Sequence, residues 1–451
     1  IKGYSFNKVG DKFNNFYNNH LKFELTNAQK NVIREIRTDL GSGAQMNRLL
    51  QGDVGSGKTI VAFMSALIAI GNGYQACIMA PTEILSYQHY NKFIDICNLL
   101  NINIKTITGS SKASYKKQLK NELKEGKIDL LIGTHAIIYD GVDFKNLGIA
   151  IIDEQHKFGV AQRSKLWHKN KLPPHILIMT ATPIPRTLAM SVYGDLDMSI
   201  INELPPGRTP INTQLISPKD KKNAYDLIRS EIKKGRQIYV VLPLIEESEK
   251  LELSAAVDVH HKLSTEIFSE FNVELLHGKM KSIEKQEVIK DFINKKSDIL
   301  VSTTVIEVGV DVPNASVMLI EDSDRFGLAQ LHQLRGRVGR GASKSYCLLS
   351  HQNKNKLSRQ RLDVLVNSND GFEISEIDLR FRGPGQVLGT KQSGLPDFAL
   401  ASLADDADVL ELARNEARII LDSDPLLSNN SMLRLLIKEQ WERLKIGNKL
   451  N

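Results

Sequence analysis

The sequence is short of cysteine and contains no long apolar run. Its 451 residues include three cysteines, Cys77, Cys97 and Cys347, and their spacing fits neither a disulfide framework nor a cysteine metal site. This scarcity excludes the disulfide-rich secreted domains and makes a reducing cytoplasm the expected compartment. No stretch reaches the roughly 18 uninterrupted apolar residues of a membrane-spanning helix, and Ile1–Gly10 has no signal-peptide pattern. We therefore expect no membrane partner.

The composition is that of a large globular protein with a basic balance. At 451 residues the chain is long enough for about three domains, and a hydrophobic content of 41% supports extensive cores. Lys and Arg number 59 against 52 Asp and Glu, so the formal net charge is +7. This excess suits an anionic partner, but an ordinary basic enzyme fits it equally well. The sequence starts at Ile1 rather than Met, and we expect a fragment or a processed product.

The most informative stretch is a glycine-rich loop with the pattern G-x-x-x-x-G-K-[ST]. An apolar run at Met46–Leu50 precedes it and predicts a strand, and Ile60–Ile68 follows it and predicts a buried helix. Glycines let backbone N–H groups turn toward phosphate oxygens, and a helix N-terminus adds positive potential. The lysine can reach the β- and γ-phosphates, and the threonine hydroxyl can bind Mg²⁺. The pattern therefore predicts a nucleoside triphosphate site in Gly52, Asp53, Val54, Gly55, Ser56, Gly57, Lys58 and Thr59.

Two further stretches predict the rest of this site. The apolar run Gly148–Ile152 predicts a strand that is followed by Asp153 and Glu154. Asp153 is placed to hold Mg²⁺, directly or through water, and Glu154 to activate the attacking water. Upstream of the loop, Gln29 lies in an amphipathic stretch for which Thr26 is the expected N-cap. Because an amide can donate and accept together, we expect Gln29 to read the edge of adenine.

Short apolar runs alternate with amphipathic stretches along the first half of the chain. This alternation predicts an α/β fold, with a parallel sheet and helices on both faces. Polar clusters follow the runs, and ligands of such sheets bind at the carboxyl ends of the strands. Thr180 and Thr182 follow one run and suit a sensor of nucleotide state, although a plain strand exit fits them too. The runs expected as strands are Gln75–Ala80, Asp129–Gly133, Gly148–Ile152 and Ile176–Met179.

A proline-rich segment divides the alternation in two. Leu204–Pro210 holds three prolines and a glycine, which indicates a linker. A second round of runs follows without a second phosphate loop. We therefore expect two tandem parallel-sheet domains and then a mainly helical region with a helical hairpin. The expected bounds are 1–204, 205–355 and 356–451, and the second set of strands is Gln237–Leu242, Phe271–Leu276, Asp298–Val301 and Val317–Ile320.

Because the chain has a single phosphate loop, the first domain alone leaves the nucleotide open on one side. We expect the second domain to close that side. The stretch Gln333–Arg340 carries Arg335, Arg337 and Arg340. Arg337 and Arg340 are three residues apart, so we expect them on one helix face. Two guanidiniums there can neutralise charge that develops on the γ-phosphate. The alternative, a basic helix on a phosphodiester backbone, fits Arg335 better than the other two.

Together these motifs resemble the superfamily 2 helicases, whose motor is a pair of RecA-like domains. The resemblance runs from Gln29 to Arg340 in the expected order. It implies ATP and Mg²⁺ as cofactors and contacts of Ala80–Leu85 and Gly133–Ile137 with a DNA backbone. It implies nucleotide contacts for Gln333 and Asp311. It also implies that the motor is coupled through His156, Thr180, Thr182, Glu307 and Gly309.

Several stretches narrow the resemblance to the bacterial RecG family. The transcription-repair coupling factors share the region after the second motor domain, but their acidic box reads Asp-Glu-Glu-Gln or similar. Here the box is Asp153-Glu154-Gln155-His156, which favours RecG. The RecG family also carries an N-terminal wedge domain that splits the branch point, and nothing in this sequence is expected to supply it. The stretches similar to RecG are Thr180–Leu188, Glu203–Thr209, Asp370–Phe372 and Arg382–Gly394.

In the RecG family, the region after the motor forms a helical hairpin and a loop that act on duplex DNA. Ser358–Val366 and Phe372–Leu379 are the expected hairpin helices. Arg361, Arg382 and Gln392 match residues that network the hairpin and the loop. A packing appendage with surface arginines is the alternative.

The resemblance implies an ATP-dependent translocase that remodels branched double-stranded DNA. Its implied work is to reverse stalled replication forks and to move Holliday junctions in recombination and repair. The expected partners are branched DNA and a single-stranded DNA-binding protein, and the expected form is a monomer at the nucleoid of the bacterial cytoplasm. A coupling-factor-like duplex translocase, an RNA helicase or remodeller, and a non-motor ATP-dependent switch are the alternatives.

Overall fold

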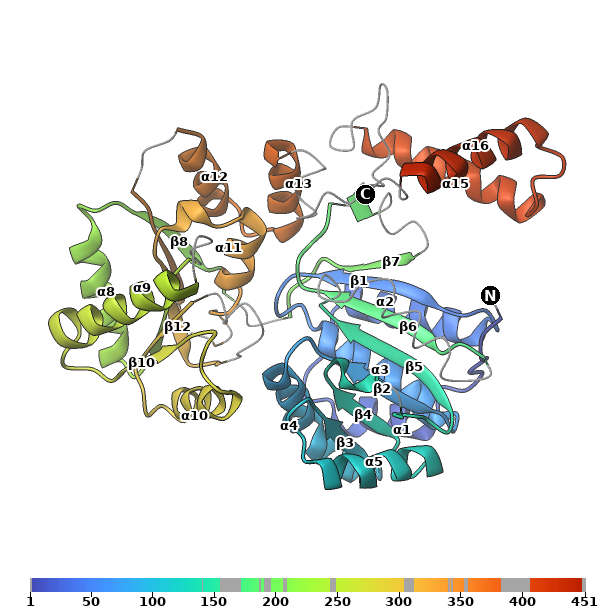
Figure 1. Ribbon diagram of the computed structural model, residues 1–451, viewed down its shortest axis with the longest axis horizontal. Helices are drawn as coiled ribbons and strands as arrows, with labels where there is room; N and C mark the ends of the chain where they lie inside the picture. Colours follow the sequence, from blue (N-terminus) through green and yellow to red (C-terminus); the bar gives the residue numbers. More distant parts are fainter. Residues whose placement is uncertain are drawn as a thin grey trace. The chain divides into compact units, whose positions relative to one another are not determined.

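The computed structural model describes most of the chain, which forms two compact units (Figure 1). The first unit comprises Ile1–Pro183 and Asp197–Gly371, and the second comprises Ile184–Leu196 and Phe372–Asn451. The described residues are 2–139, 141–154, 172–185, 188–189, 196–205, 209–243, 249–303, 312–339, 341, 344–352, 356–382 and 406–447.

The first unit begins with a parallel sheet of seven strands in the order β3-β4-β2-β5-β6-β1-β7. All neighbouring strands in it run parallel, as the alternation of apolar runs predicts. The central strands are buried along most of their length, because helices cover the sheet. The strands are β1 (Asn47–Gly52), β2 (Gln75–Met79), β3 (Ile104–Ile107), β4 (Leu130–Gly133), β5 (Leu147–Asp153), β6 (His175–Thr180) and β7 (Asp197–Ile201).

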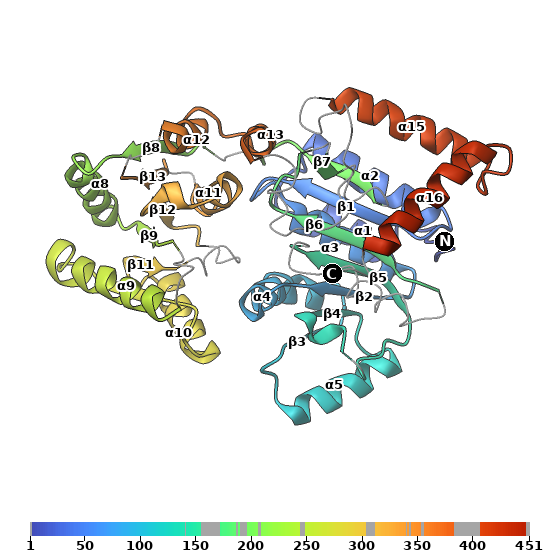
Figure 2. The ribbon, with the colours of Figure 1, turned by 45° about the horizontal axis from the view of Figure 1, so that its top comes forward.

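One apolar helix forms the centre of the core of this sheet. α3 (Lys58–Gly71) is buried on nearly all sides, so the expected buried helix is confirmed. α1 (Asp11–Asn15) and α2 (Asn27–Gly41) both pack on α3 (Figure 2). α4 (Glu83–Leu99) joins the same core through Phe93 and Cys97. Because α3 begins directly after the phosphate loop, this packing fixes the position of the loop.

The second half of the first unit is a parallel sheet of six strands in the order β10-β11-β9-β12-β13-β8. Its core is built from the apolar residues of these strands and of the covering helices. Two parallel-sheet domains in tandem therefore confirm the expected fold class. The strands are β8 (Asn212–Ile216), β9 (Gln237–Val241), β10 (Val273–Leu276), β11 (Ile299–Ser302), β12 (Ala315–Ile320) and β13 (Tyr346–Ser350). The helices are α8 (Lys221–Lys233), α9 (Glu249–Lys262), α10 (Ser282–Ile293) and α11 (Leu328–Arg335).

Four strands have no counterpart in the sequence prediction. β3, β7 and β8 lie at sheet edges, where only one neighbour is paired and polar residues are tolerated. Each of them mixes polar and apolar residues, so no continuous apolar run marks it. β13 is internal and short, and it was missed although four of its residues are buried. The chain passes from one sheet to the other between Ile201 and Asn212. The boundary at residue 204 stays a prediction.

The C-terminal region is helical in its described part. α12 (Lys356–Asn367) ends the first unit, and α13 begins at Gly371 and runs to Arg382. These two helices cover the ranges expected for the two hairpin helices, and their arrangement as a hairpin stays a prediction. The second unit also contains α15 (Ala407–Ser423) and α16 (Ser431–Gly447). None of the described helices is long and apolar enough to cross a membrane.

The beginning of α2 confirms the predicted cap. Thr26 accepts a hydrogen bond from the N–H of Gln29 (3.2 Å), and the side chain of Gln29 accepts one from the N–H of Thr26 (3.0 Å). This reciprocal pair is a capping box, which satisfies two backbone donors that the first helical turn leaves open.

Replacement of Thr26 by alanine should lower the free energy of unfolding by about 1 kcal/mol, because the cap is lost. Thr26→Ser keeps the hydroxyl and should retain most of the stability. Urea unfolding followed by far-ultraviolet circular dichroism measures the shift in midpoint. An alanine variant with the midpoint of the parent chain would contradict the capping role.

Candidate active site

The phosphate loop has the backbone that an anion site requires. Gly55 and Gly57 adopt positive φ values of 81° and 90°, which lets the loop turn its N–H groups inward. α3 begins at Lys58, so the positive end of its dipole faces the loop. The ammonium of Lys58 donates to the carbonyls of Gly52 (2.5 Å) and Asp53 (2.8 Å). The buried hydroxyl of Ser56 has no hydrogen-bond partner among the described residues. These donors fit a bound phosphate.

Two acids lie beside this loop, at the carboxyl end of β5. Asp153 ends the strand, and Glu154 follows it in a left-handed conformation with φ of 56°. Such a φ is uncommon for a residue other than glycine and is found where surrounding structure holds the backbone in place. Here the N–H of Glu154 donates to the carbonyl of Met179 (2.9 Å) at the end of β6. This hydrogen bond to the neighbouring strand helps to hold the left-handed backbone of Glu154.

Burial and mutual charge set the ionisation of this cluster. Burial lowers the pKa of Lys58 to about 8, although Glu154, Asp153 and Asp53 oppose the shift. Burial and the charge of Asp153 raise the pKa of Glu154 to about 7, while Lys58 and Arg337 oppose that shift. A carboxyl that titrates near neutrality is suited to accept a proton from water. These charges couple the phosphate loop, the end of β5 and the segment after α11.

Gln29 contacts the phosphate loop. Its side chain is buried, and its amide nitrogen donates to the carbonyl of Ser56 in the phosphate loop (2.8 Å). Its amide oxygen takes part in the capping box with Thr26. In this structure Gln29 therefore holds the loop against α2. To contact adenine, the amide of Gln29 would have to give up its hydrogen bond to Ser56. The adenine-reading role of Gln29 stays a prediction.

Thr180 and Thr182 lie together at the end of β6. Their hydroxyls are 2.8 Å apart, and the N–H of Thr182 is 3.3 Å from the Thr180 hydroxyl. β6 is paired with β1, whose end leads into the phosphate loop. The two hydroxyls are therefore one strand away from the loop, which suits the sensor role proposed for them.

The carboxylate of Asp53, in the phosphate loop, accepts two hydrogen bonds from residues distant in the sequence. One oxygen accepts a hydrogen bond from Nε2 of His332 on α11 (2.8 Å), and the other accepts from the N–H of Gly371 (3.3 Å). Burial alone would raise the pKa of Asp53, but the hydrogen bonds from His332 and Gly371 and the charge of Lys58 lower it. The phosphate loop is thereby joined to the second sheet domain and to the start of α13.

Arg335 completes this connection. Its guanidinium donates to Nδ1 of His332 (2.8 Å), and because an arginine can only donate, Nδ1 must accept. The ring proton of His332 is therefore on Nε2, which donates the hydrogen bond to Asp53. The same guanidinium donates to the carbonyls of Leu365 (2.7 Å) and Ser368 (2.8 Å) at the end of α12. Arg335 is 2% exposed, which does not fit the alternative of a contact with a phosphodiester backbone.

The glycines around this contact leave no room for a side chain. A Cβ on Gly371 would lie 2.0 Å from Oδ1 of Asp53 and 2.5 Å from Nε2 of His332. A Cβ on Gly336 would lie 2.7 Å from Cβ of Val54 in the phosphate loop. Sequence reasoning missed His332 and Gly371, because no local pattern marks a partner so distant in the chain.

The predicted shared helix face of Arg337 and Arg340 is wrong. α11 ends at Arg335, and Gly336 caps it. Arg337 lies in the following turn, where its N–H donates to the carbonyl of Leu334 (3.0 Å) and Gly339 has a positive φ of 76°. Arg337 is nevertheless buried, and its charge acts on both Lys58 and Glu154. It therefore lies near Lys58 and Glu154, and its role in closing the nucleotide site stays a prediction.

The remaining site residues divide into two groups. Gln333 is buried on α11, and Arg361 on α12 donates to the carbonyl of Phe326 (2.9 Å). Arg382 ends α13, and its side chain lies outside the described part. Also outside the described residues are His156, Glu307, Gly309, Asp311, Arg340 and Gln392.

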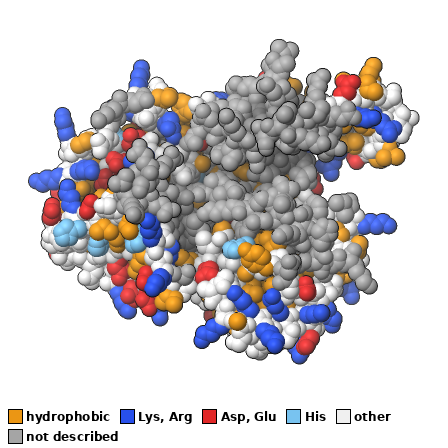
Figure 3. Space-filling model, viewed as in Figure 1, with side chains coloured by type: hydrophobic (Ala, Val, Ile, Leu, Met, Phe, Trp, Pro, Cys, Tyr) orange, Lys and Arg blue, Asp and Glu red, His pale blue; other side chains and the backbone are white. Residues whose placement is uncertain are grey.

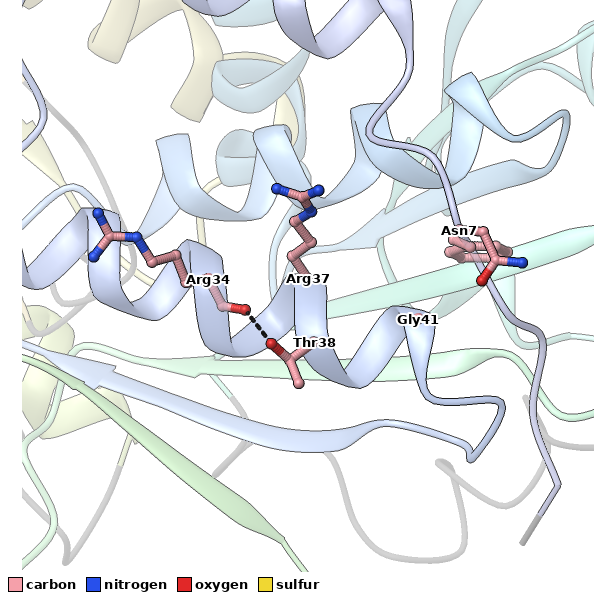
Figure 4. A pocket seen from close by; sticks show the side chains of 6 residues that line it. Asn7, Arg34, Arg37, Thr38 and Gly41 are labelled. Atoms are coloured by element: carbon pink, nitrogen blue, oxygen red, sulfur yellow. Dashed lines mark hydrogen bonds between the residues drawn. The ribbon is translucent and has the colours of Figure 1, made fainter.

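A cavity of about 430 Å³ lies elsewhere, between α2 and the N-terminal segment (Figure 4). Arg34, Arg37 and Asn7 line it, and Thr38 turns back to hydrogen bond the carbonyl of Arg34 (3.0 Å). None of the residues expected at the ATP site lines this cavity. It therefore has no part in the site described above.

Comparison with known protein families agrees with this fold. A DEAD/DEAH box helicase domain matches residues 26–191, and a helicase conserved C-terminal domain matches residues 221–342. The first unit is therefore a two-domain helicase motor. The C-terminal part of domain 3 of ATP-dependent DNA helicase RecG matches residues 368–449. The chain belongs to the RecG family.

Individual relatives support this assignment. The chain is 54% identical over 427 residues to ATP-dependent DNA helicase RecG of Synechocystis sp., covering 95% of this chain and 51% of the relative. It is 50% identical over 447 residues to the RecG of Aquifex aeolicus, covering 97% and 56%. A solved structure of RecG bound to a three-way DNA junction matches with 43% identity and a TM-score of 0.75, covering 91% and 53%. The chain thus spans about half the length of the relatives it matches.

The pH dependence of kcat/KM for ATP should be bell-shaped, because this parameter reports ionisations of the free enzyme. Falling pH protonates Glu154 near its pKa of about 7, which removes the base if Glu154 has the predicted role. Rising pH deprotonates Lys58 near its pKa of about 8 and removes the phosphate-binding charge. Lys58→Arg should keep the acid limb and move the alkaline limb upward, because an arginine stays charged. Steady-state ATPase assays without nucleic acid measure both limbs, and a flat profile across neutral pH would exclude this pair.

Proposed function

We propose that this chain is the motor of an ATP-dependent DNA helicase that remodels branched double-stranded DNA. The observation that carries the proposal is the contact of Asp53 with His332 and Gly371. The phosphate loop is hydrogen-bonded to α11 of the second motor domain and to the first residue of α13. Such contacts suit a protein in which ATP hydrolysis displaces the second motor domain and the hairpin. The name and the junction-bound structure of the relatives support DNA, and branched DNA, as the substrate.

In the proposed mechanism, residues of both sheet domains surround ATP. The phosphate loop and Lys58 bind the phosphates. Thr59 and Asp153 would hold Mg²⁺, which would supply positive charge to the phosphates when bound. Glu154 accepts a proton from the attacking water. Arg337, together with Arg340, stabilises the charge that develops on the γ-phosphate. The two domains must then close on ATP before hydrolysis, and hydrolysis allows them to open again.

The proposed DNA path crosses the carboxyl end of the first sheet. Thr82 caps α4 after β2, and Thr134 caps the short helix at His135–Ile137 after β4. β2 and β4 are neighbours, so two helix N-termini lie side by side where a phosphodiester backbone can accept from them. Lysines gather over α5 in the same domain (Figure 3). The exposed ones on and beside this helix are Lys112, Lys117, Lys124 and Lys127.

The finer features of the function follow from the family resemblance. The substrates are stalled forks and Holliday junctions in recombination and repair, and a single-stranded DNA-binding protein is a further partner. The working form is a monomer at the nucleoid of the bacterial cytoplasm. Arg361, Arg382 and Gln392 network the hairpin and its loop on duplex DNA. The proposed bounds are 1–204 for the first motor domain, 205–355 for the second and 356–451 for the C-terminal region.

ATP hydrolysis by this chain should be stimulated about tenfold or more by duplex or three-way junction DNA, and less by single-stranded DNA or RNA. The assay compares the four nucleic acids at one ionic strength, and DNA affinity should fall steeply with added salt if several phosphates are neutralised. Glu154→Gln should bind ATP but lose turnover by roughly 10²-fold or more, because the base is removed. Strongest stimulation by RNA would support an RNA helicase instead. Equal rates with and without nucleic acid would support an ATP-dependent switch.

Loss of the hydrogen bonds around Asp53 should uncouple hydrolysis from work on DNA. His332→Leu removes the donor, and Gly371→Ala places a Cβ against the carboxylate. A hydrogen bond to a charged group contributes about 1.5–3 kcal/mol, so branched-DNA unwinding should fall roughly tenfold or more. ATPase without DNA should change far less. His332→Gln is the matched control, because its amide can still accept from Arg335 and donate to Asp53. Parallel loss of both activities in His332→Leu would indicate a structural role.

A further inference from the structure

A histidine of α4 contacts the acid that is proposed to hold Mg²⁺. Nε2 of His89 lies 3.0 Å from Oδ2 of Asp153. Both side chains are largely buried, with exposed fractions of 6% for His89 and 13% for Asp153. An ionised carboxylate can only accept, so Nε2 of His89 carries the proton and donates it to Oδ2. The nucleotide site described above does not include His89.

The contact occupies one oxygen of Asp153 and leaves the other available. Carboxylates that bind metal ions are commonly held in turn by a hydrogen-bond donor, which fixes their rotation and their basicity. A donor on Oδ2 orients Oδ1 as the remaining acceptor. The geometry therefore matches the support that a metal-binding aspartate needs.

The imidazole of His89 is itself held in place by aromatic packing. Its ring is nearly parallel to that of Phe93, with an interplanar angle of 4° and a centroid distance of 6.5 Å. Phe93 stacks on Phe63 at 4.3 Å and 8°. Phe63 belongs to α3, the helix that begins at Lys58. Asp153 is thus positioned from the same helix that positions the phosphate-binding lysine.

α4 also connects this contact to the proposed DNA path. The helix is capped by Thr82, inside the segment proposed to contact the DNA backbone, and His89 lies about two turns further along. Ser86, His89, Phe93 and Cys97 form its buried side. A rigid helix with one end at DNA and its buried side at Asp153 can pass a displacement from one to the other.

We propose that His89 is a positioning residue for Mg²⁺, which sets the orientation of Asp153 through its Nε2–H. The inference rests on the proposed function, in which Asp153 is the Mg²⁺ ligand. Its consequence is that the tightening of nucleotide binding by Mg²⁺ depends on the hydrogen bond of a residue that touches neither nucleotide nor metal. Binding of nucleotide without Mg²⁺ does not depend on it.

The test measures the affinity of a fluorescent ADP analogue for the chain with Mg²⁺ and with EDTA. The readout is the ratio of the two dissociation constants, which reports Mg²⁺ support without hydrolysis. His89→Phe keeps an aromatic ring against Phe93 and removes the donor. It should reduce the ratio about tenfold, the size typical of such outer ligands, with little change in EDTA. His89→Gln keeps an N–H donor and should restore most of the ratio.

Two controls separate the inference from the function on which it rests. Asp153→Asn should abolish the Mg²⁺ effect, and Tyr90→Phe, on the same helix at the edge of the core, should leave it unchanged. A normal ratio in His89→Phe with a lost ratio in Asp153→Asn overturns the role of His89 alone. A normal ratio in Asp153→Asn overturns the metal assignment of the proposed function. Equal weakening with Mg²⁺ and EDTA in His89→Phe shows a structural role and also overturns the inference. If His89→Phe does not fold, His89→Met replaces it under the same criteria.

Discussion

The carboxylate of Asp53 is the group on which the arrangement of this motor depends. It belongs to the phosphate loop, yet it accepts from residues 279 and 318 positions further along the chain. A buried carboxylate is costly unless its ionised form is hydrogen-bonded, so loss of either donor leaves charge poorly satisfied. The loop cannot shift in response to a nucleotide without changing the surroundings of His332 and of the first residue of α13. A nucleotide site built this way is inseparable from the parts that it moves.

The buried charges at the site show how domain closure can prepare the chemistry. Burial raises the pKa of Glu154 to about 7, and the nearby charges of Lys58 and Arg337 pull it back down. Arg337 comes from the segment after α11, whereas Glu154 and Lys58 come from the first sheet domain. When Arg337 is close, Glu154 ionises more readily and is a better acceptor for the proton of water. Separation of the domains would remove that charge and leave Glu154, the proposed base, less ionised.

The sequence predicted the parts of this protein that local patterns encode. The phosphate loop, the internal strands other than β13 and the helix cap at Thr26 follow from periodicity, glycine spacing and capping chemistry. The edge strands β3, β7 and β8 were missed, because a strand with one paired side needs no continuous apolar run. The end of α11 was misjudged, since Gly336 stops the helix before Arg337. The partners of Asp53, Arg335 and Asp153 could not be predicted, because each lies in another element and only folding brings it near.

Two aspartates of the first sheet domain share one design. Asp53, after β1, and Asp153, at the end of β5, each accept from Nε2 of a histidine on another helix. His332 is hydrogen-bonded to Arg335, which donates to the carbonyls at the end of α12. His89 belongs to α4, whose N-terminus is capped by Thr82. Close-packed interiors transmit small displacements rather than absorb them. A displacement at the phosphates can therefore be passed on through two sets of packed contacts. One leads to the hairpin and the other to the proposed DNA path. A translocase needs both, because its grip on DNA must change while the hairpin moves.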